Sequence, residues 1–415
     1  MTVFTPDWKV TINSVEYTGV TLANLSITSG RTDIYRQPVA GYCQVELINL
    51  DLSSVTTEIN QGITISVKDS TATYQPIFGG YISDIVQEVR DLGNTGQTQV
   101  ITITALGALS RLPKATTDGV LASDFDGDQI YTLLSGVLFQ SWAQAPATTT
   151  WATYTATETW EDALNTGLGE IDQPGDYEMI ARSASPTDVY TLAGDIAQSG
   201  LGYLYEDAQG RIGYADSTHR AQYLSTNGYV ELSAEDAYGR GIRLYTKGGE
   251  IRNSVTIFSG NNFSDESVDS DPASIAQYGT LSQTINTYLK TKSDAEAQAA
   301  TYIELRAYPR PGLDAITFPL QSPKLSDADR DALINIFIGM PVDLLDLPSN
   351  MNDAQFQGFV EGWTFRAGYN SLDLTIYLSP ISFSLNAFRW NSVPVVETWN
   401  TLSGTLDWLN ATIVA

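Results

Sequence analysis

The sequence has 415 residues, which corresponds to two or three domains of ordinary size. It carries 22 basic and 48 acidic side chains, and the resulting net charge of −26 argues against binding a nucleic-acid backbone through basic patches. Hydrophobic residues make up 42% of the chain, so it can bury sizeable cores. No run reaches the roughly 18 apolar residues of a membrane span, and the first residues lack a signal-peptide pattern. We therefore expect no membrane anchor.

Cysteine and histidine are almost absent. The single cysteine, Cys43, excludes an intrachain disulfide. Cys43, Val45 and Leu47 alternate along a strand-like segment, which predicts that the thiol is buried as a small hydrophobe. The single histidine excludes a His-rich metal site and leaves little basis for His-based catalysis. We interpret this residue, His219, as a surface residue of a hairpin.

Residues 1–112 are predicted to be all strands. Segments such as GYCQVELINL, GITISVKD and QVITITAL alternate or cluster β-branched residues between Gly, Asn, Asp and Ser. Many short strands need a way to hide their edges, and a closed or nearly closed antiparallel barrel provides one. We therefore predict a β-barrel domain over this range.

Residues 113–228 change to a helical period and predict a small α/β domain. Two helical stripes are formed by Ile130, Leu133, Leu134, Val137 and Leu138, and by Val189, Leu192, Ala193, Ile196 and Ala197. The second stripe has Ser185 as a predicted N-cap, Pro186 at the first position and Gly200 at its end. A hairpin is predicted to turn near Asp207–Gly210. Residues 143–175 have no assignment.

Residues 229–388 return to strands, with helical insertions. A helix is predicted from Ser293 and Glu296, which have capping-box spacing, to the prolines at 309 and 311. A shorter helix in SDADRDALINIFIG is predicted to close at Gly339. The segments VDLLDL, FQGFVEGWTF and SLDLTIYLS complete a second predicted barrel.

The same strand set occurs twice in the chain. Gly62 opens GITISV and Gly80 lies in FGGYISDIVQEV, while Gly339 opens GMPVDL and Gly358 lies in FQGFVEGWTF. Each second glycine has a phenylalanine two residues before it, and an aromatic and a β-branched residue directly after it. Glycines between strand-forming residues indicate a bulge or a close backbone approach. We predict two related barrels joined by an α/β insert, and assign a structural role to these four glycines.

The chain resembles the baseplate hub or tail-associated minor tail proteins of long-tailed bacteriophages. The resemblance rests on VTINSVEYTG, the F-x-G-x-[IV] pattern followed by TITALGALSRL, GYLYEDAQGRIGYA, EIRNSVTIF, IGMPVDLLDLP and FQGFVEGW, in this order over nearly the whole chain to about residue 388. It implies a mainly β chain, in which a small α/β domain joins two antiparallel barrels similar to the tail-tube subunit. It also implies that three chains close a ring.

This resemblance leads to a functional expectation. A ring of three chains with two similar barrels each presents six similar units, so it could adapt a sixfold tail tube to a threefold tip. We expect a homotrimeric structural virion protein at the phage tail tip, made in the host cytoplasm, without catalytic site, metal or cofactor. Its expected partners are the tail tube or distal tail ring, other baseplate proteins such as a spike or fibre, and DNA that passes without specific binding during genome ejection. Acidic residues along a lumen would let DNA slide.

Residues 389–415 contain a shorter repeat. Trp390, Trp399 and Trp408 are nine residues apart, and tryptophan suits a docking surface because it joins apolar area to a hydrogen-bond donor. The segment is predicted either to dock on a partner or to fold back as strands on its own barrel.

Other chemistry receives little support. Asp124, Asp126 and Asp128 invite a calcium interpretation, but the sixth and twelfth positions are Gln129 and Ser135 instead of Gly and Glu. These carboxylates fit a helix N-terminus, and a second acidic cluster fits a solvated loop: Asp265, Glu266, Asp269 and Asp271. No spacing pairs the glycosidase candidates in the insert, which are Glu158, Glu161, Asp162 and Glu170. The alternatives that remain are a carbohydrate-binding receptor protein of the tail and, after it, a cell-wall glycosidase.

Overall fold

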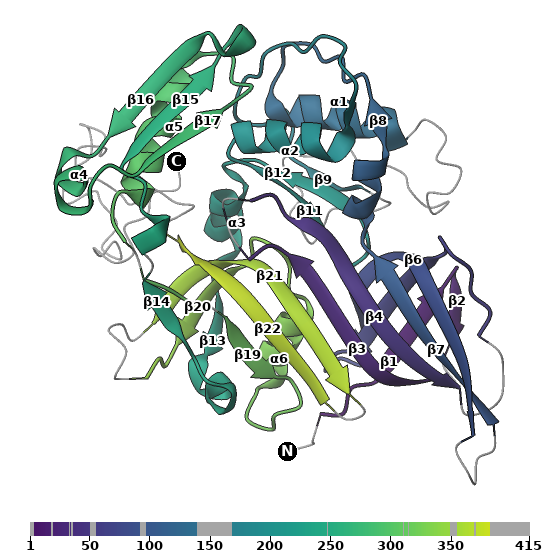
Figure 1. Ribbon diagram of the computed structural model, residues 1–415. Coiled ribbons are helices and arrows are strands. Elements are labelled where there is room, and N and C mark those ends of the chain that lie inside the picture. The colour runs from purple at the N-terminus through teal and green to yellow at the C-terminus, as the bar shows by residue number, and fades with distance from the viewer. Residues whose placement is uncertain are drawn as a thin grey trace.

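The computed structural model describes residues 4–17, 20–32, 34, 36–49, 55–91, 97–138, 168–246, 248–309, 311–313, 315–348, 355–368 and 371–381. One large sheet occupies the lower part of the molecule in Figure 1, and two smaller α/β units lie above it. Among the described residues, no helix has the length and hydropathy needed to span a membrane.

Twelve of the described strands form the large sheet, in the order β13-β20-β21-β3-β4-β7-β6-β5-β1-β2, with β22 paired to β21 and β19 paired to β22. The strands from the first part of the chain are β1 (Trp8–Ile12), β2 (Val15–Tyr17), β3 (Val20–Gly30), β4 (Val39–Asn49), β5 (Gly62–Lys68), β6 (Tyr74–Asp91) and β7 (Gln97–Leu106). The strands from the second part are β13 (Val230–Ser233), β19 (Ile316–Pro319), β20 (Pro341–Leu345), β21 (Phe356–Gly368) and β22 (Ser371–Pro380). The protein is thus mainly β, as the sequence predicts.

The described strands do not close into the two separate barrels expected from the sequence. Instead, β3 and β21 pair antiparallel from Leu25 opposite Ala367 to Gly30 opposite Gly362, which joins the two strand sets into one open sheet. We call this pairing the internal joint. An unpaired strand edge exposes a row of backbone N–H and C=O groups. The joint satisfies one such edge from each set at once, so neither set has to close on itself.

One apolar core runs beneath both strand sets. It contains buried residues from both, including Ile27, Val45 and Ile103 from the first and Phe365 and Leu374 from the second. Cys43 belongs to this core and is fully buried, so the prediction for the thiol is confirmed. Alternate residues of these strands face the core, as the period of two requires.

The two strand sets share the same register. Ile85 of β6 pairs with Ile103 of β7, and Trp363 of β21 pairs with Ile376 of β22, at offsets of 363 − 85 = 278 and 376 − 103 = 273 residues. The same offsets hold along both ladders. At one end, Tyr81 opposite Leu106 corresponds to Phe359 opposite Ser379, and at the other end, Arg90 opposite Thr98 corresponds to Gly368 opposite Ser371. Both ladders shift register at one corresponding point, between Ile82 and Asp84 and between Val360 and Gly362. A shared bulge inside a shared register indicates that these are two versions of one module.

The first upper unit contains a three-stranded sheet and two helices. Its elements are α1 (Asp126–Leu138), β9 (Leu168–Ile171), α2 (Val189–Ser199), β11 (Tyr203–Glu206) and β12 (Ile212–Ala215), with a short pair, β8 (Thr116–Thr117) and β10 (Thr187–Asp188), beside them. The hairpin between β11 and β12 turns at the predicted place, where Asp207 accepts hydrogen bonds from the backbone N–H groups of Gln209 and Arg211. Helix α3 (His219–Asn227) then leads down to the large sheet (Figure 1).

The second upper unit interrupts the second strand set. It contains β15 (Ser254–Ser259), β16 (Asp265–Ser270), α4 (Pro272–Tyr278), β17 (Ser282–Asn286) and α5 (Lys292–Arg306). It lies between β14 (Leu244–Thr246) and β18 (Pro311–Leu313), which pair with each other. Val255, Ile257 and Ala299 from this unit share a second apolar core with Leu192 and Ile196 of α2. The two upper units therefore pack as one layer.

Three helix boundaries differ from the predictions. Helix α2 begins after Asp188, whose side chain accepts from the Thr191 N–H, rather than after Ser185; its predicted end at Gly200 is correct. Helix α5 is capped by Thr291 rather than Ser293. Helix α6 (Asp327–Ile334) ends at Asn335, before Gly339. In both α2 and α5 another residue with a suitable side-chain oxygen lies within three positions of the predicted cap, and only the backbone path decides which oxygen reaches the N3 amide.

Candidate functional site

The face of the large sheet opposite the core is lined mostly by polar side chains, many of them threonines. Cross-strand pairing aligns them in rows across the internal joint: Thr317, Thr375, Thr364, Thr28 and Tyr42 in one row, Asp373, Arg366, Ser26, Gln44, Thr104 and Asp84 in the next, and Asn24, Glu46, Thr102 and Val86 in a third. The Thr317 and Thr375 hydroxyl oxygens lie 2.8 Å apart, within hydrogen-bonding distance. We call this surface the polar sheet face.

The polar sheet face is nearly neutral although the chain is strongly acidic. Its rows contain three acidic residues, Asp84, Glu46 and Asp373, and one basic residue, Arg366. Arg240 pairs with Asp373. The Arg90 guanidinium lies between two carboxylates, 2.8 Å from Glu88 and 3.6 Å from Glu46. Most of the negative charge therefore lies on other parts of the molecule.

A buried ion cluster holds the internal joint. The Glu361 carboxylate of β21 accepts from Arg31 Nε at 2.7 Å, and from Arg220 Nη1 at 2.6 Å and Nη2 at 3.0 Å. The Ser379 hydroxyl also donates to it, at 2.6 Å. Arg31 follows β3 and Arg220 lies in α3, so the cluster ties both strand sets to helix α3. All three charged residues are at least nine-tenths buried, and paired buried charges of this kind fix geometry.

The charge state of Glu361 follows from its partners. Burial disfavours its ionised form, but the charges of Arg220 and Arg31 outweigh burial and lower the pKa of Glu361 to about 2. Gly30 explains how the strands approach at this point. Its φ is +82°, and a side chain there would collide with the backbone of Glu361 and Gly362.

A second buried carboxylate attaches the first upper unit to the first strand set. Glu206 ends β11, and its carboxylate accepts from the backbone N–H groups of Gly41 and Leu109. Side chains at Gly41 or Gly107 would collide with this carboxylate. Burial raises the pKa of Glu206 to about 7. The hairpin tip at Gly210 also packs backbone to backbone against Gly79 of β6, so the contact depends on glycines from both sides.

His219 is not on the surface of a hairpin, as the sequence suggested. It is the first residue of α3, is 7% exposed, and its Nδ1 lies 2.7 Å from Asp172 Oδ2. The next residue, Arg220, reaches Glu361 in the opposite direction. Two adjacent residues thus connect α3 to the upper unit and to the large sheet. Nothing in the local sequence marks this, because both partners are distant in the chain.

The three aspartates at the start of α1 have different surroundings in the structure. Asp126 and Asp128 lie in the first turn of the helix, as predicted from the favourable position of carboxylates there. Asp126 is fully buried and accepts from the Tyr214 hydroxyl and the Tyr177 N–H, and burial raises its pKa to about 7. The described residues contain no group of three or more acidic, His or Cys side chains arranged to hold a metal ion. Of the predicted loop cluster, Asp265 and Glu266 begin β16 and Asp271 caps α4 through the Ser274 N–H.

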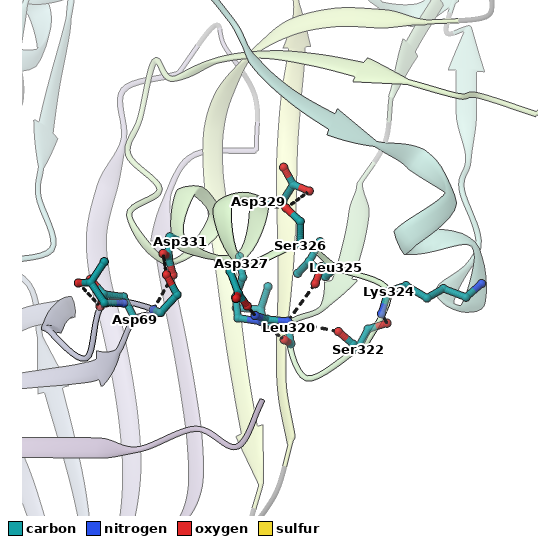
Figure 2. A network of polar contacts seen from close by, with 12 residues as sticks. Asp69, Leu320, Ser322, Lys324, Leu325, Ser326, Asp327, Asp329 and Asp331 are labelled. Carbon is teal, nitrogen blue, oxygen red and sulfur yellow. Dashed lines mark hydrogen bonds and ion pairs between the residues drawn. The ribbon is translucent and has the colours of Figure 1, made fainter. Parts of the chain in front are cut away.

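A polar network links α6 to the first strand set. Figure 2 shows Asp331 of α6 beside the turn at Asp69, where the Ser70 N–H and hydroxyl both donate to the Asp331 carboxylate. The preceding residue, Arg330, is buried. Its guanidinium donates to the carbonyls of Leu320 and Leu325, at 2.8 and 3.0 Å, and pairs with Asp327. The network supplies a further contact between the two sets.

The predicted glycines occupy defined places in the two modules. Side chains at Gly80 and Gly358 would collide with the carbonyls of Leu106 and Ser379, which are corresponding residues, and with the preceding phenylalanine rings. Gly62 pairs with Tyr81, but its counterpart by register is Pro341, since Pro341 pairs with Phe359. Gly339 instead corresponds to Asn60, and both have positive φ, 87° and 72°. The sequence alignment of Gly62 with Gly339 is therefore shifted by two residues.

Several candidates lie outside the described residues: Trp390, Trp399 and Trp408, and Glu158, Glu161 and Asp162. Glu170 lies in β9, and the structure describes only its backbone.

The fold is shared with proteins of solved structure. The chain is similar to the tail protein from Neisseria meningitidis MC58, with a TM-score of 0.59 and 11% identity over 92% of this chain and 98% of that one. It is also similar to the 43 kDa tail protein of prophage MuSo2 from Shewanella oneidensis, with a TM-score of 0.56 and 10% identity over 91% and 98%. At such low identity, the likeness establishes a shared fold over nearly the full length of all three chains. No protein-family model and no curated protein sequence matches the chain.

Proposed function

We propose that the chain is a structural component of a phage tail, and that it forms a homotrimeric hub at the distal end of the tail tube. The duplicated module is the observation that carries the proposal. Two modules of one register, joined in one sheet, give each chain two similar units, so that three chains present 3 × 2 = 6 units to a sixfold tube while keeping a threefold tip. The tail-protein fold supports the same assignment.

The polar sheet face is the proposed wall of the DNA passage. DNA binds proteins mainly through phosphate contacts to Lys and Arg, and this face offers hydroxyl and amide groups with little net charge. Passage without adhesion therefore follows from the scarcity of basic side chains on the wall rather than from a dense acidic lining. Replacing Thr102 and Gln44 with lysine should make the assembled protein retain DNA in a gel-shift assay at low salt, whereas the wild-type protein should not.

The remaining partners follow from the place of the ring. The tail tube or a distal tail ring would meet one side, and a spike, fibre or other baseplate protein the other. The tryptophan segment at 389–415 is proposed as a docking element for one of these neighbours. Truncation after Leu385 should leave a folded, self-associating chain that fails to assemble into tails, and an unfolded product would instead favour packing of the segment on its own module.

The oligomeric state tests the central claim. Native mass spectrometry and sedimentation of the purified chain, alone and mixed with its tail neighbours, should detect a species of three chains. A strictly monomeric particle under both conditions contradicts the hub proposal. Low-resolution images of intact virions, labelled with an antibody against the chain, should place it at the tail tip.

A further inference from the structure

The internal joint has an unfilled counterpart elsewhere in the same chain. In β21, residues before the bulge pair with β20, and residues 362–367 after the bulge pair with β3. In β6, residues before the bulge pair with β5 in the same way. After the bulge, one edge of residues 84–91 pairs with β7. The other edge, which corresponds to the edge of β21 that pairs with β3, pairs with no described strand.

Side-chain exposure follows this difference in pairing. Val86 and Val89 of β6 are 62% and 68% exposed. At the 278-residue offset they correspond to Thr364 and Ala367, which are 9% and 5% exposed beside β3. Val86 and Val89 lie on opposite faces of β6, so both faces of the strand are more exposed beside the open edge than they are beside the internal joint. An open strand edge of this kind can pair with a further strand.

The strand that corresponds to β3 is also unpaired on one edge. Val45 of β4 and Ile316 of β19 occupy equivalent positions, since they pair with Ile103 and with Ile376. The same 271-residue offset equates Tyr42 with Leu313 of β18. Tyr42 pairs with Thr28 of β3, and Leu313 pairs with Leu244 of β14. Strand β14 therefore takes the place of β3, and its second edge pairs with no described strand.

The geometry points to a strand-addition interface between copies of this chain, in which β14 of one copy pairs antiparallel with residues 84–86 of β6 in the next. This inference rests on the proposed function and specifies its contact. The interface repeats the internal joint between two chains. Within one chain, Thr364 lies opposite Thr28. Val86 is the counterpart of Thr364 and Leu244 is the counterpart of Thr28, so Val86 of one copy lies opposite Leu244 of the next.

Charge and symmetry support this occupant. The β6 edge contains Asp84 and Glu88 against the single Arg90, whereas the segment that leads into β14 contains Arg240 and Arg243. Because the two edges are different surfaces, the contact is head-to-tail, and such contacts close into rings when the rotation permits. A ring built this way alternates internal and intermolecular joints of one kind.

A cysteine pair tests the register directly. The only native cysteine, Cys43, is fully buried, so Val86→Cys with Leu244→Cys in the full chain introduces the only reactive pair. Mild oxidation should give covalent multimers on a non-reducing gel, up to the mass of the closed ring, and reduction should return single chains. Each single variant, and the pair Val15→Cys with Leu244→Cys, should give no such series. Val15 is 52% exposed, but it lies on β2, three strands away from β6 and outside the proposed contact.

A charge reversal gives a second readout. Glu88→Lys opposes the basic segment of the next copy and should weaken self-association at least tenfold in sedimentation at low salt, with an unchanged melting temperature for the single chain. If the chain forms a trimer that the Val86→Cys and Leu244→Cys pair does not link, the strand-addition interface is wrong and the hub proposal stands. If the chain remains monomeric even with its tail neighbours, both are wrong.

Discussion

Ser83 and Glu361 occupy the same position in the two modules, each as the extra residue of the shared bulge. The Ser83 hydroxyl contacts its own module, where it donates to the Thr104 carbonyl and to Asp84. Glu361 instead binds Arg31 and Arg220 from two other parts of the chain. The same bulge position therefore makes only local contacts in the first module and long-range contacts in the second.

Removing the Glu361 charge should destabilise the protein strongly. Glu361→Gln leaves Arg31 and Arg220 buried without their carboxylate, and breaking a buried pair in this way costs about 3–5 kcal/mol. Urea unfolding followed by circular dichroism measures the effect. Glu88→Gln is the matched control, because it removes an exposed partner of Arg90 and should leave the free energy of unfolding nearly unchanged. Equal effects of the two variants would refute a structural role for the cluster.

The two bulge-side glycines should respond alike to a methyl group. Gly80→Ala and Gly358→Ala place Cβ against the carbonyls of Leu106 and Ser379, and forcing such contacts apart costs about 1–3 kcal/mol. Thermal unfolding should show a lower melting temperature for both. Gly248→Ala meets no atom within 4 Å and should have little effect. A neutral result at one site only would mean that the two positions are not equivalent.

Stability should fall as pH rises through the neutral range. The pKa of Glu206 is about 7 in the folded chain against a usual value of 4.5, and that of Asp126 is about 7 against 3.8. At a pH between the usual value and the folded-state value of each group, the folded chain holds a proton that the unfolded chain has released. The free energy of unfolding therefore decreases as pH increases through this range.

Urea unfolding at pH 5 and pH 8 measures this dependence. We expect the chain to lose about 1–3 kcal/mol per group at the higher pH. Glu206→Gln and Asp126→Asn should each flatten the profile, and a profile unchanged in both variants would contradict the assignment. Glu361 acts in the opposite range: its lowered pKa adds stability above about pH 4.5 that is lost as pH falls toward 2.

The α6 network should divide into one essential and one dispensable part. Arg330→Met removes a buried guanidinium and leaves the Leu320 and Leu325 carbonyls without donors, which costs about 1–3 kcal/mol for each unsatisfied group. Asp331→Ala removes an exposed link to Ser70 and should cost about 1 kcal/mol or less. Denaturation of both variants side by side checks this order, and the reverse order would show that the link to the first module matters more than the core of α6.

Local patterns predicted the elements better than their connections. The stripe at Val189, Leu192 and Ile196, the turn at Asp207–Gly210 and the buried Cys43 depend on residues near in sequence, and they lie where the sequence indicates. The internal joint pairs residue 30 with residue 362, and no periodicity carries information about such a distant partner. The expectation of two closed barrels failed for this reason.

The candidate site shows the same division. Polar residues of the sheet face could be recognised by alternation, but Glu361, Arg31, Arg220 and Glu206 appear in the sequence as ordinary charges. Their burial depends on three segments meeting around them. His219 was misassigned because its neighbour Asp172 comes from the part of the chain that has no readable pattern.

The internal joint also has a consequence for synthesis. Strand β3 ends at Gly30 and β21 begins at Phe356, so the ribosome must add 356 − 30 = 326 residues before the partner appears. At about 5–20 residues per second this takes roughly 16–65 s, during which the nascent chain carries an exposed sheet edge. We expect the protein to depend on chaperones while it is translated, and to aggregate when expression outpaces them.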